Sequence, residues 1–252
     1  MAVFEQQSVS QPMSKLFIIP CCARKRPGGE QVDTYQDRLV DVVSPGIQEN
    51  VISARANVLA GLQNEQKYLS GKYDKNKSIQ DGPDFGGTST KGLYLPAVDR
   101  YIGSLYTGNL NTVNAIRKNE ARNSKVRILI LSALYGPLHP QDLIQDYNLQ
   151  MSDKPAYRAW KDQFPRFLED YVDRNQISDI NLYVGGSTRY FRVAELAAKR
   201  LKERELIRSV VQYEVIDGSS YVTPFTHGQL LYSHLTQGID SKLESKVLAR
   251  EL

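Results

Sequence analysis

The sequence predicts an α/β fold, with a single domain in which a mixed β-sheet is flanked by helices and closed by a C-terminal β-hairpin plus helix. Short apolar runs at 15–20, 126–131 and 180–184 have the composition of buried strands. These runs alternate with segments in which apolar residues recur at helical spacing. Turn residues at 217–220 join two β-prone runs, as in a hairpin.

Composition sets the limits of the domain. The chain has 252 residues, 41% of them hydrophobic, which is enough for one sizeable core. Residues 1–14 are polar and predict a disordered N-terminus, so the domain is expected at 15–237. Within it, residues 71–92 have the composition of a flexible insertion, and 238–252 form a polar C-terminal tail.

The sequence was searched for membrane-spanning and targeting segments. No apolar run approaches the roughly 20 residues that a membrane-spanning helix needs. No apolar signal segment is recognisable at the start of the chain. We therefore expect a cytoplasmic protein with no membrane partner.

The first predicted strand, 15–20, leads into two adjacent cysteines and a basic loop. Cys21 and Cys22 lack zinc-ligand spacing and are too few for a disulfide framework. The cations that follow them at a strand end are suited to holding an anion, although a solvated charge run is the alternative. Helical spacing over 35–69, broken at Pro45, predicts two helices.

The remaining elements follow the same patterns. An aromatic segment at 93–108 is expected to pack on the core. The predicted elements after it are a helix through 110–117, the strand 126–131, a helix at 157–172, the strand 180–184, a helix at 191–206, the hairpin 210–223 and a helix at 227–236.

The loop after the strand 126–131 carries an unusual density of polar side chains. In an open α/β sheet, ligands bind beyond the carboxyl ends of the strands. Small and hydroxyl residues also follow the strand 180–184 and precede a helix, where backbone N–H groups are accessible. The predicted pocket comprises Ser132, Tyr135, Gly136, Gly185, Gly186 and Ser187. Alternatively, Asp142 and Asp146 cap a turn and Tyr147 packs in the core.

Several segments together resemble the YaaA family of bacterial peroxide-stress proteins. The family signature, a strand followed by Ser-Gly-Leu-Tyr-Gly, Pro-x-Asp and Pro-Tyr, is similar to residues 132–147. Residues 20–25 look like the family's Ser-Pro-Ala-Lys loop, and 101–108 resemble its central aspartate-and-tyrosine segment. The resemblance covers about 15–235. It implies a cytosolic protein that protects DNA and proteins during hydrogen peroxide stress, limits free iron and binds duplex DNA through a basic cleft.

Double-stranded DNA is therefore the expected partner. The net charge of +4 is too small to indicate nucleic-acid binding by itself, so the argument depends on where the cations lie. Contacts to phosphates would be independent of base sequence and sensitive to salt. The candidate DNA-binding residues are Arg24, Lys25, Arg26, Arg189, Arg192, Lys199 and Arg200.

An enzyme is the alternative hypothesis. A loop with tyrosines and carboxylates is suited to a nucleobase or nucleoside, which would suggest an N-glycosidase or base-exchange enzyme. Its catalytic residues would be Asp142, Asp146 and Tyr147. The three histidines lack a metal-ligand pattern, so we predict no metal and no cofactor. The sequence does not indicate an oligomeric state.

Overall fold

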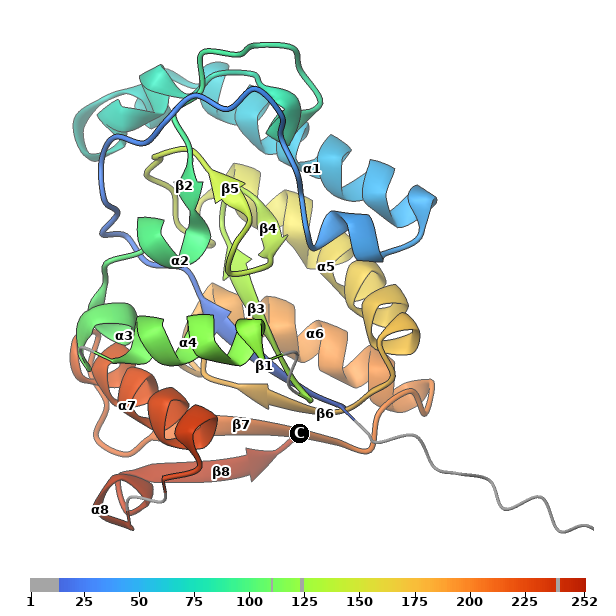
Figure 1. Ribbon diagram of the computed structural model, residues 1–252, viewed down its shortest axis with the longest axis vertical. Helices are drawn as coiled ribbons and strands as arrows, with labels where there is room; N and C mark the ends of the chain where they lie inside the picture. The colour runs from blue at the N-terminus through green and yellow to red at the C-terminus, as the bar shows by residue number, and fades with distance from the viewer. Residues whose placement is uncertain (1–13, 110, 123–124, 239–240) are drawn as a thin grey trace, which may run out of the picture.

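The computed structural model describes residues 14–109, 111–122, 125–238 and 241–252. Its centre is a six-stranded sheet with the order β4-β3-β1-β6-β7-β8 (Figure 1). The parallel strands are β1 (Ser14–Pro20), β3 (Val126–Ser132), β6 (Ile177–Leu182) and β7 (Ser209–Val215), and the antiparallel edge strands are β4 (Gly136–Leu138) and β8 (Val247–Glu251). The predicted mixed α/β sheet is confirmed.

Helices cover both faces of this sheet. Figure 1 shows α4 (Thr112–Ala121) and α7 (Val222–Thr236) on one side, and α5 (Lys154–Arg174) and α6 (Arg189–Glu203) on the other. The central strand β1 is consequently buried on both faces, and Leu16, Ile18 and Ile19 are fully inaccessible. In register, Ile18 lies between Leu129 of β3 and Leu182 of β6. This explains the uninterrupted apolar runs of the sequence.

The remaining helices surround this framework. The long helix α1 (Pro45–Gln63) begins with Pro45 at its first position, where proline is tolerated, and packs on α5. The shorter elements are the 3₁₀ helices η1 (Val40–Val42), η2 (Gln66–Leu69), η3 (Gly71–Ser78) and η4 (Pro83–Phe85), the helices α2 (Ala97–Arg100), α3 (Ser104–Thr107) and α8 (Ser241–Glu244), and the two-stranded sheet β2 (Leu95–Pro96) with β5 (Leu143–Ile144).

The segment predicted as a flexible insertion forms η3 and η4 and contributes buried polar side chains. Asn76 is 2% exposed, and its amide donates to the backbone oxygens of Tyr68 and Asn148 at 2.9 and 3.0 Å. Asp84 is fully buried. The flexibility of 71–92 stays a prediction, but in this structure the segment covers the loop that follows β3.

The C-terminal region differs from the predicted hairpin. Residues 221–223 do not form a strand, because Val222 begins α7, where the Ser219 hydroxyl accepts its N–H at 3.1 Å. The antiparallel partner of β7 is instead β8, which comes from the predicted polar tail. At the other end, Ser14 already belongs to β1, and the rest of the predicted disordered N-terminus lies outside the described residues.

Candidate functional site

The loops that leave β1 and β6 diverge to opposite faces of the sheet. The chain after β1 leads through α4 to β3 on one side of β1, whereas β6 leads through α6 to β7 on its other side. Such a topological switch point leaves a crevice at the carboxyl ends of the two strands, where open α/β sheets bind ligands. Cys21 and Tyr183 are the first residues after these strands.

A cavity of about 480 Å³ lies at this switch point. Its walls come from the ends of β1, β6 and β7, from the start of α6 and from α7. The lining residues are Pro20, Cys21, Leu105, Val184, Gly185, Gly186, Ser187, Thr188, Tyr190, Glu214, Val215, Gly218, Ser219, Ser220, Thr223, Pro224 and His227. We call this space the switch-point cavity.

A second cavity, of about 510 Å³, lies beside the first and shares Cys21, Ser187, Thr188 and Tyr190 with it. The Tyr190 hydroxyl and the Cys21 thiol form a hydrogen bond of 3.0 Å in the wall common to both. Burial raises the pKa of Tyr190, so its hydroxyl stays protonated at neutral pH. We call this second space, which also contacts Ala23 and Arg189, the side groove.

The start of α6 shapes both spaces. Thr188 is its N-cap, and its hydroxyl accepts the N–H of Phe191 at 3.2 Å while donating to the Gly185 carbonyl at 2.7 Å. The predicted pocket residues Gly185, Gly186 and Ser187 therefore do line a cavity.

The other predicted pocket residues lie in a closed interior. Ser132, Tyr135 and Tyr147 are fully buried, and the Ser132 and Tyr147 hydroxyls are hydrogen-bonded at 2.8 Å. Gly136 has a φ of +67° and packs directly on the ring of Trp160. The predicted pocket is thus divided, because the end of β3 is covered and only the end of β6 is open.

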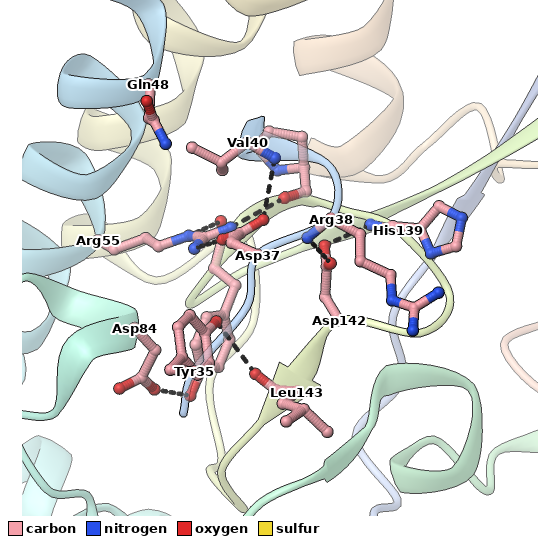
Figure 2. Close-up of polar contacts among 12 residues, drawn as sticks. Tyr35, Asp37, Arg38, Val40, Gln48, Arg55, Asp84, His139, Asp142 and Leu143 are labelled. Atoms are coloured by element: carbon pink, nitrogen blue, oxygen red, sulfur yellow. Dashed lines mark hydrogen bonds and ion pairs between the residues drawn. The ribbon is translucent and has the colours of Figure 1, made fainter. Parts of the chain in front are cut away.

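The carboxylates predicted as catalytic have structural partners (Figure 2). Asp142 is fully buried, and its two oxygens accept backbone N–H groups of Arg38 and His139, each at 2.7 Å. Burial raises its pKa. Asp146 pairs instead with Lys75 at 2.9 Å. The alternative interpretation of the sequence, with structural aspartates and Tyr147 in the core, agrees with these contacts, and a catalytic role stays an untested prediction.

A buried ion pair lies beside Asp142. Arg55 is fully buried and pairs with Asp37, and its Nε donates to the Tyr135 carbonyl at 2.9 Å. No sequence motif indicated this pair, since an arginine in an amphipathic helix normally faces solvent. It connects the segment before η1, helix α1 and the loop after β3.

Lys25 differs from its predicted role as a DNA contact. It is only 4% exposed, its Nζ donates to the Cys22 carbonyl at 2.8 Å, and it lies 3.9 Å from the centre of the Tyr147 ring. Lys25 forms an isolated antiparallel bridge with Tyr101, so alternating side chains point inward and outward. Arg24 and Arg26 are consequently exposed.

The predicted cations of α6 are all exposed, but their partners differ. Lys199 pairs with Glu195 at 3.2 Å, and Arg200 pairs with Glu169. Arg192 lies 3.9 Å from Glu195. Arg189 stacks over the ring of Tyr157 at 4.9 Å and borders the side groove.

Sequence reasoning predicted only Gly185, Gly186 and Ser187 of the switch-point cavity. The missed side chains include Cys21, Tyr190, Glu214 and His227. The position of Cys21 directly after a strand was the one available signal. Within the described ranges, no group of three or more His, Cys, Asp or Glu residues is arranged to hold a metal ion. None of the described helices is long and apolar enough to cross a bilayer.

The fold defines an α/β protein with a cavity at the carboxyl ends of the strands of a mostly parallel sheet, the place where open α/β sheets bind ligands. The family model for the peroxide stress protein YaaA matches residues 38–235. The chain therefore belongs to the YaaA peroxide stress protein family, which confirms the resemblance seen in the sequence.

Relatives in several bacteria carry only a family designation. A UPF0246 protein of Paraburkholderia xenovorans is 31% identical over 118 residues, which cover 44% of this chain and 43% of the relative. A UPF0246 protein of Dinoroseobacter shibae is 28% identical over 180 residues, covering 68% and 62%. One of Desulfotalea psychrophila is 28% identical over 156 residues, covering 58% and 56%. The matched segments thus span less than two thirds of each relative.

Proposed function

We propose that this protein binds duplex DNA in the cytoplasm in the context of peroxide stress, through arginines that flank the side groove. The observation that carries the proposal is the meeting of two basic segments at this groove. Ala23, which precedes Arg24, and Arg189 both belong to its lining, although one follows β1 and the other begins α6.

Four exposed arginines are the proposed phosphate contacts: Arg24, Arg26, Arg189 and Arg192. Arg24, Arg26 and Arg189 form no ion pair within the described part of the chain, which leaves their charge uncompensated by nearby carboxylates. Lys199 and Arg200 contribute less, because each is paired with a glutamate. Lys25 is excluded by its burial.

The expected signature is a dependence on salt rather than on base sequence. Each neutralised phosphate contributes about −0.9 to the slope of log K against log salt, so three or four contacts give a slope of about −3 to −4. Phosphate contacts fix position on the duplex without reading bases, and affinity should therefore vary little between duplex sequences.

The test is fluorescence anisotropy of a short labelled duplex over a salt series. The double variant Arg24→Ala/Arg189→Ala should bind more weakly at low salt and lower the steepness of the slope by about 2. A matched double variant, Lys118→Ala/Arg122→Ala, also removes two exposed cations, but near the end of α4, where Asn119 contacts the first residue of β3. That variant should bind like the unaltered protein.

Two results would overturn the proposal. The first is that the unaltered protein fails to bind the duplex at low salt. The second is that both double variants lose affinity equally. In the second case the binding would reflect total charge rather than the side groove.

A further inference from the structure

We propose that the switch-point cavity binds the amino-substituted nitrogen heterocycle of a nucleoside, either free or held out of a nucleic acid strand. This inference goes beyond phosphate contact, because it concerns a different space and a different part of the ligand. It rests on two unpaired acceptors, a group of uncommitted hydroxyls and apolar walls.

The first acceptor is His227 of α7, which is 1% exposed and lines the cavity. Its Nε2 lies 2.7 Å from the carbonyl oxygen of Tyr213. A carbonyl only accepts, so Nε2 carries the proton and Nδ1 has a lone pair. Nδ1 has no hydrogen-bond partner among the described residues. Burial lowers the pKa of the ring, which keeps it neutral at neutral pH.

The second acceptor is Glu214 of β7, whose side chain lines the cavity and is 37% exposed. One of its oxygens, Oε2, pairs with Arg250 of β8 at 2.6 Å. The other, Oε1, faces Gly186 and lies 4.0 Å from the position that a Cβ on that glycine would take. Gly186 therefore leaves room in front of a carboxylate oxygen that forms no hydrogen bond within the described ranges.

Hydroxyl groups line the mouth of the cavity. The side chains of Ser187, Ser220 and Thr223 form no hydrogen bond within the described structure, and the Ser219 hydroxyl accepts the N–H of Val222 while retaining its own proton. Uncommitted hydroxyls match the hydroxyls of a ribose, since each can donate or accept. Between them and His227 the walls are apolar: Pro20, Leu105, Val184, Val215 and Pro224.

This combination selects a class of ligand. The two acceptors favour N–H groups on the ligand, and the apolar walls favour flat faces without polar atoms. An amino-substituted purine or pyrimidine has both. A phosphate is disfavoured inside the cavity, because Glu214 would repel it and Thr188 already caps α6. The volume of about 480 Å³ falls in the range of small-molecule pockets.

The test is a fluorescence titration of the full chain with 2-aminopurine riboside, followed by competition with guanosine, adenosine and uridine. Guanosine and adenosine, which carry an exocyclic amine, should displace the probe more effectively than uridine, which lacks one. Glu214→Gln should weaken binding about tenfold, because it removes a charged acceptor. Ser220→Trp, at an exposed position on the cavity rim, should block access.

Controls separate the cavity from folding and from the side groove. Glu203→Gln changes an exposed glutamate at the end of α6, outside the cavity, and should bind normally. Arg24→Ala/Arg189→Ala should also retain the free nucleoside, so that failure of DNA binding and failure of this proposal are distinguishable. Fluorescence of Trp160, the single tryptophan, verifies that each variant is folded.

A second arm uses a single-stranded oligonucleotide with one 2-aminopurine to identify the source of the base. Binding of the free riboside supports a nucleoside ligand. A response from the oligonucleotide alone, weakened by Glu214→Gln, supports a base held in a strand. The proposal is overturned if neither probe binds, or if Glu214→Gln and Ser220→Trp both leave the affinity unchanged.

Discussion

The loops that follow β3 and β6 begin at the same edge of the sheet, and both carry glycine and hydroxyl groups. The loop after β3 is closed: Asp84 from the 71–92 segment accepts the Tyr135 hydroxyl at 2.8 Å and the Gln145 amide at 3.0 Å. The loop after β6 borders a cavity, in which His227 Nδ1 and Glu214 Oε1 form no hydrogen bond within the described ranges. Polar composition alone therefore does not identify a site. Whether the chain itself satisfies those polar groups is the better criterion.

The largest expected effect concerns the closed region. Arg55→Met leaves Asp37 buried without its counterion and removes the donor to the Tyr135 carbonyl. Breaking a buried pair on one side costs about 3–5 kcal/mol. The free energy of unfolding, measured by urea titration with Trp160 fluorescence, should fall by that amount.

The control for Arg55 is an ion pair at the surface. Arg117→Met removes the partner of Asp99, but the Arg117 side chain is 45% exposed, so the loss should not exceed about 1 kcal/mol. Equal losses in the two variants would show that the Arg55 pair behaves like a surface pair, and the description of a closed interior would then be wrong.

A second comparison places the same substitution in both loops. In Gly136→Ala the new methyl would lie 2.3 Å from a Trp160 ring carbon, at a φ of +67°. Backbone strain and overpacking together should lower the free energy of unfolding of this variant by about 2–4 kcal/mol. In Gly185→Ala the nearest atoms are methyl carbons of Thr188 and Thr223 at 3.5 Å, an ordinary contact.

We expect Gly185→Ala to change the free energy of unfolding by less than about 1 kcal/mol, because the methyl makes only ordinary van der Waals contacts. The measurement is the same urea titration for both variants. If Gly185→Ala proved as damaging as Gly136→Ala, the switch-point cavity would not be open in solution.

Sequence reasoning located the fold better than the site. Uninterrupted apolar runs identify β1 and β3, because strands covered on both faces have no polar face. The end of β6 was identified from Gly185, Gly186 and Ser187, since small residues before a helix leave space for a ligand. These predictions depend on local chemistry, which the sequence displays directly.

The rest depends on contacts between distant segments. Lys25 looks like a solvated cation in the sequence, and only its bridge to Tyr101 directs it inward. Asp142 looks catalytic until the N–H groups of Arg38 and His139 are brought to its oxygens. Glu214 and His227 occur in segments with no motif, and the packing of α7 against β7 places them in one cavity.

The smallest expected effect is a difference in pH dependence between the two regions. The folded-state pKa of His227 is lowered from 6.5 by burial, so below that pH the unfolded chain binds more protons and stability falls as the pH drops. The pKa of Asp84 is raised from 3.8 by burial, so its contribution increases as the pH falls towards that value. As the pH falls, His227 in the open region should therefore lower the free energy of unfolding, whereas Asp84 in the closed region should raise it.

Urea titrations at pH 7, 6 and 5 test these opposite signs. Because the variant has no imidazole to protonate, the stability lost between pH 7 and 5 should be smaller in His227→Gln than in the unaltered protein. Part of the loss should remain, because burial also lowers the pKa of His234. Asp84→Asn should lose more stability on acidification than the unaltered protein. If either variant has the same pH dependence as the unaltered protein, the replaced side chain is solvated in the folded state rather than buried. The two regions would then not differ in the way that burial shifts their pKa values.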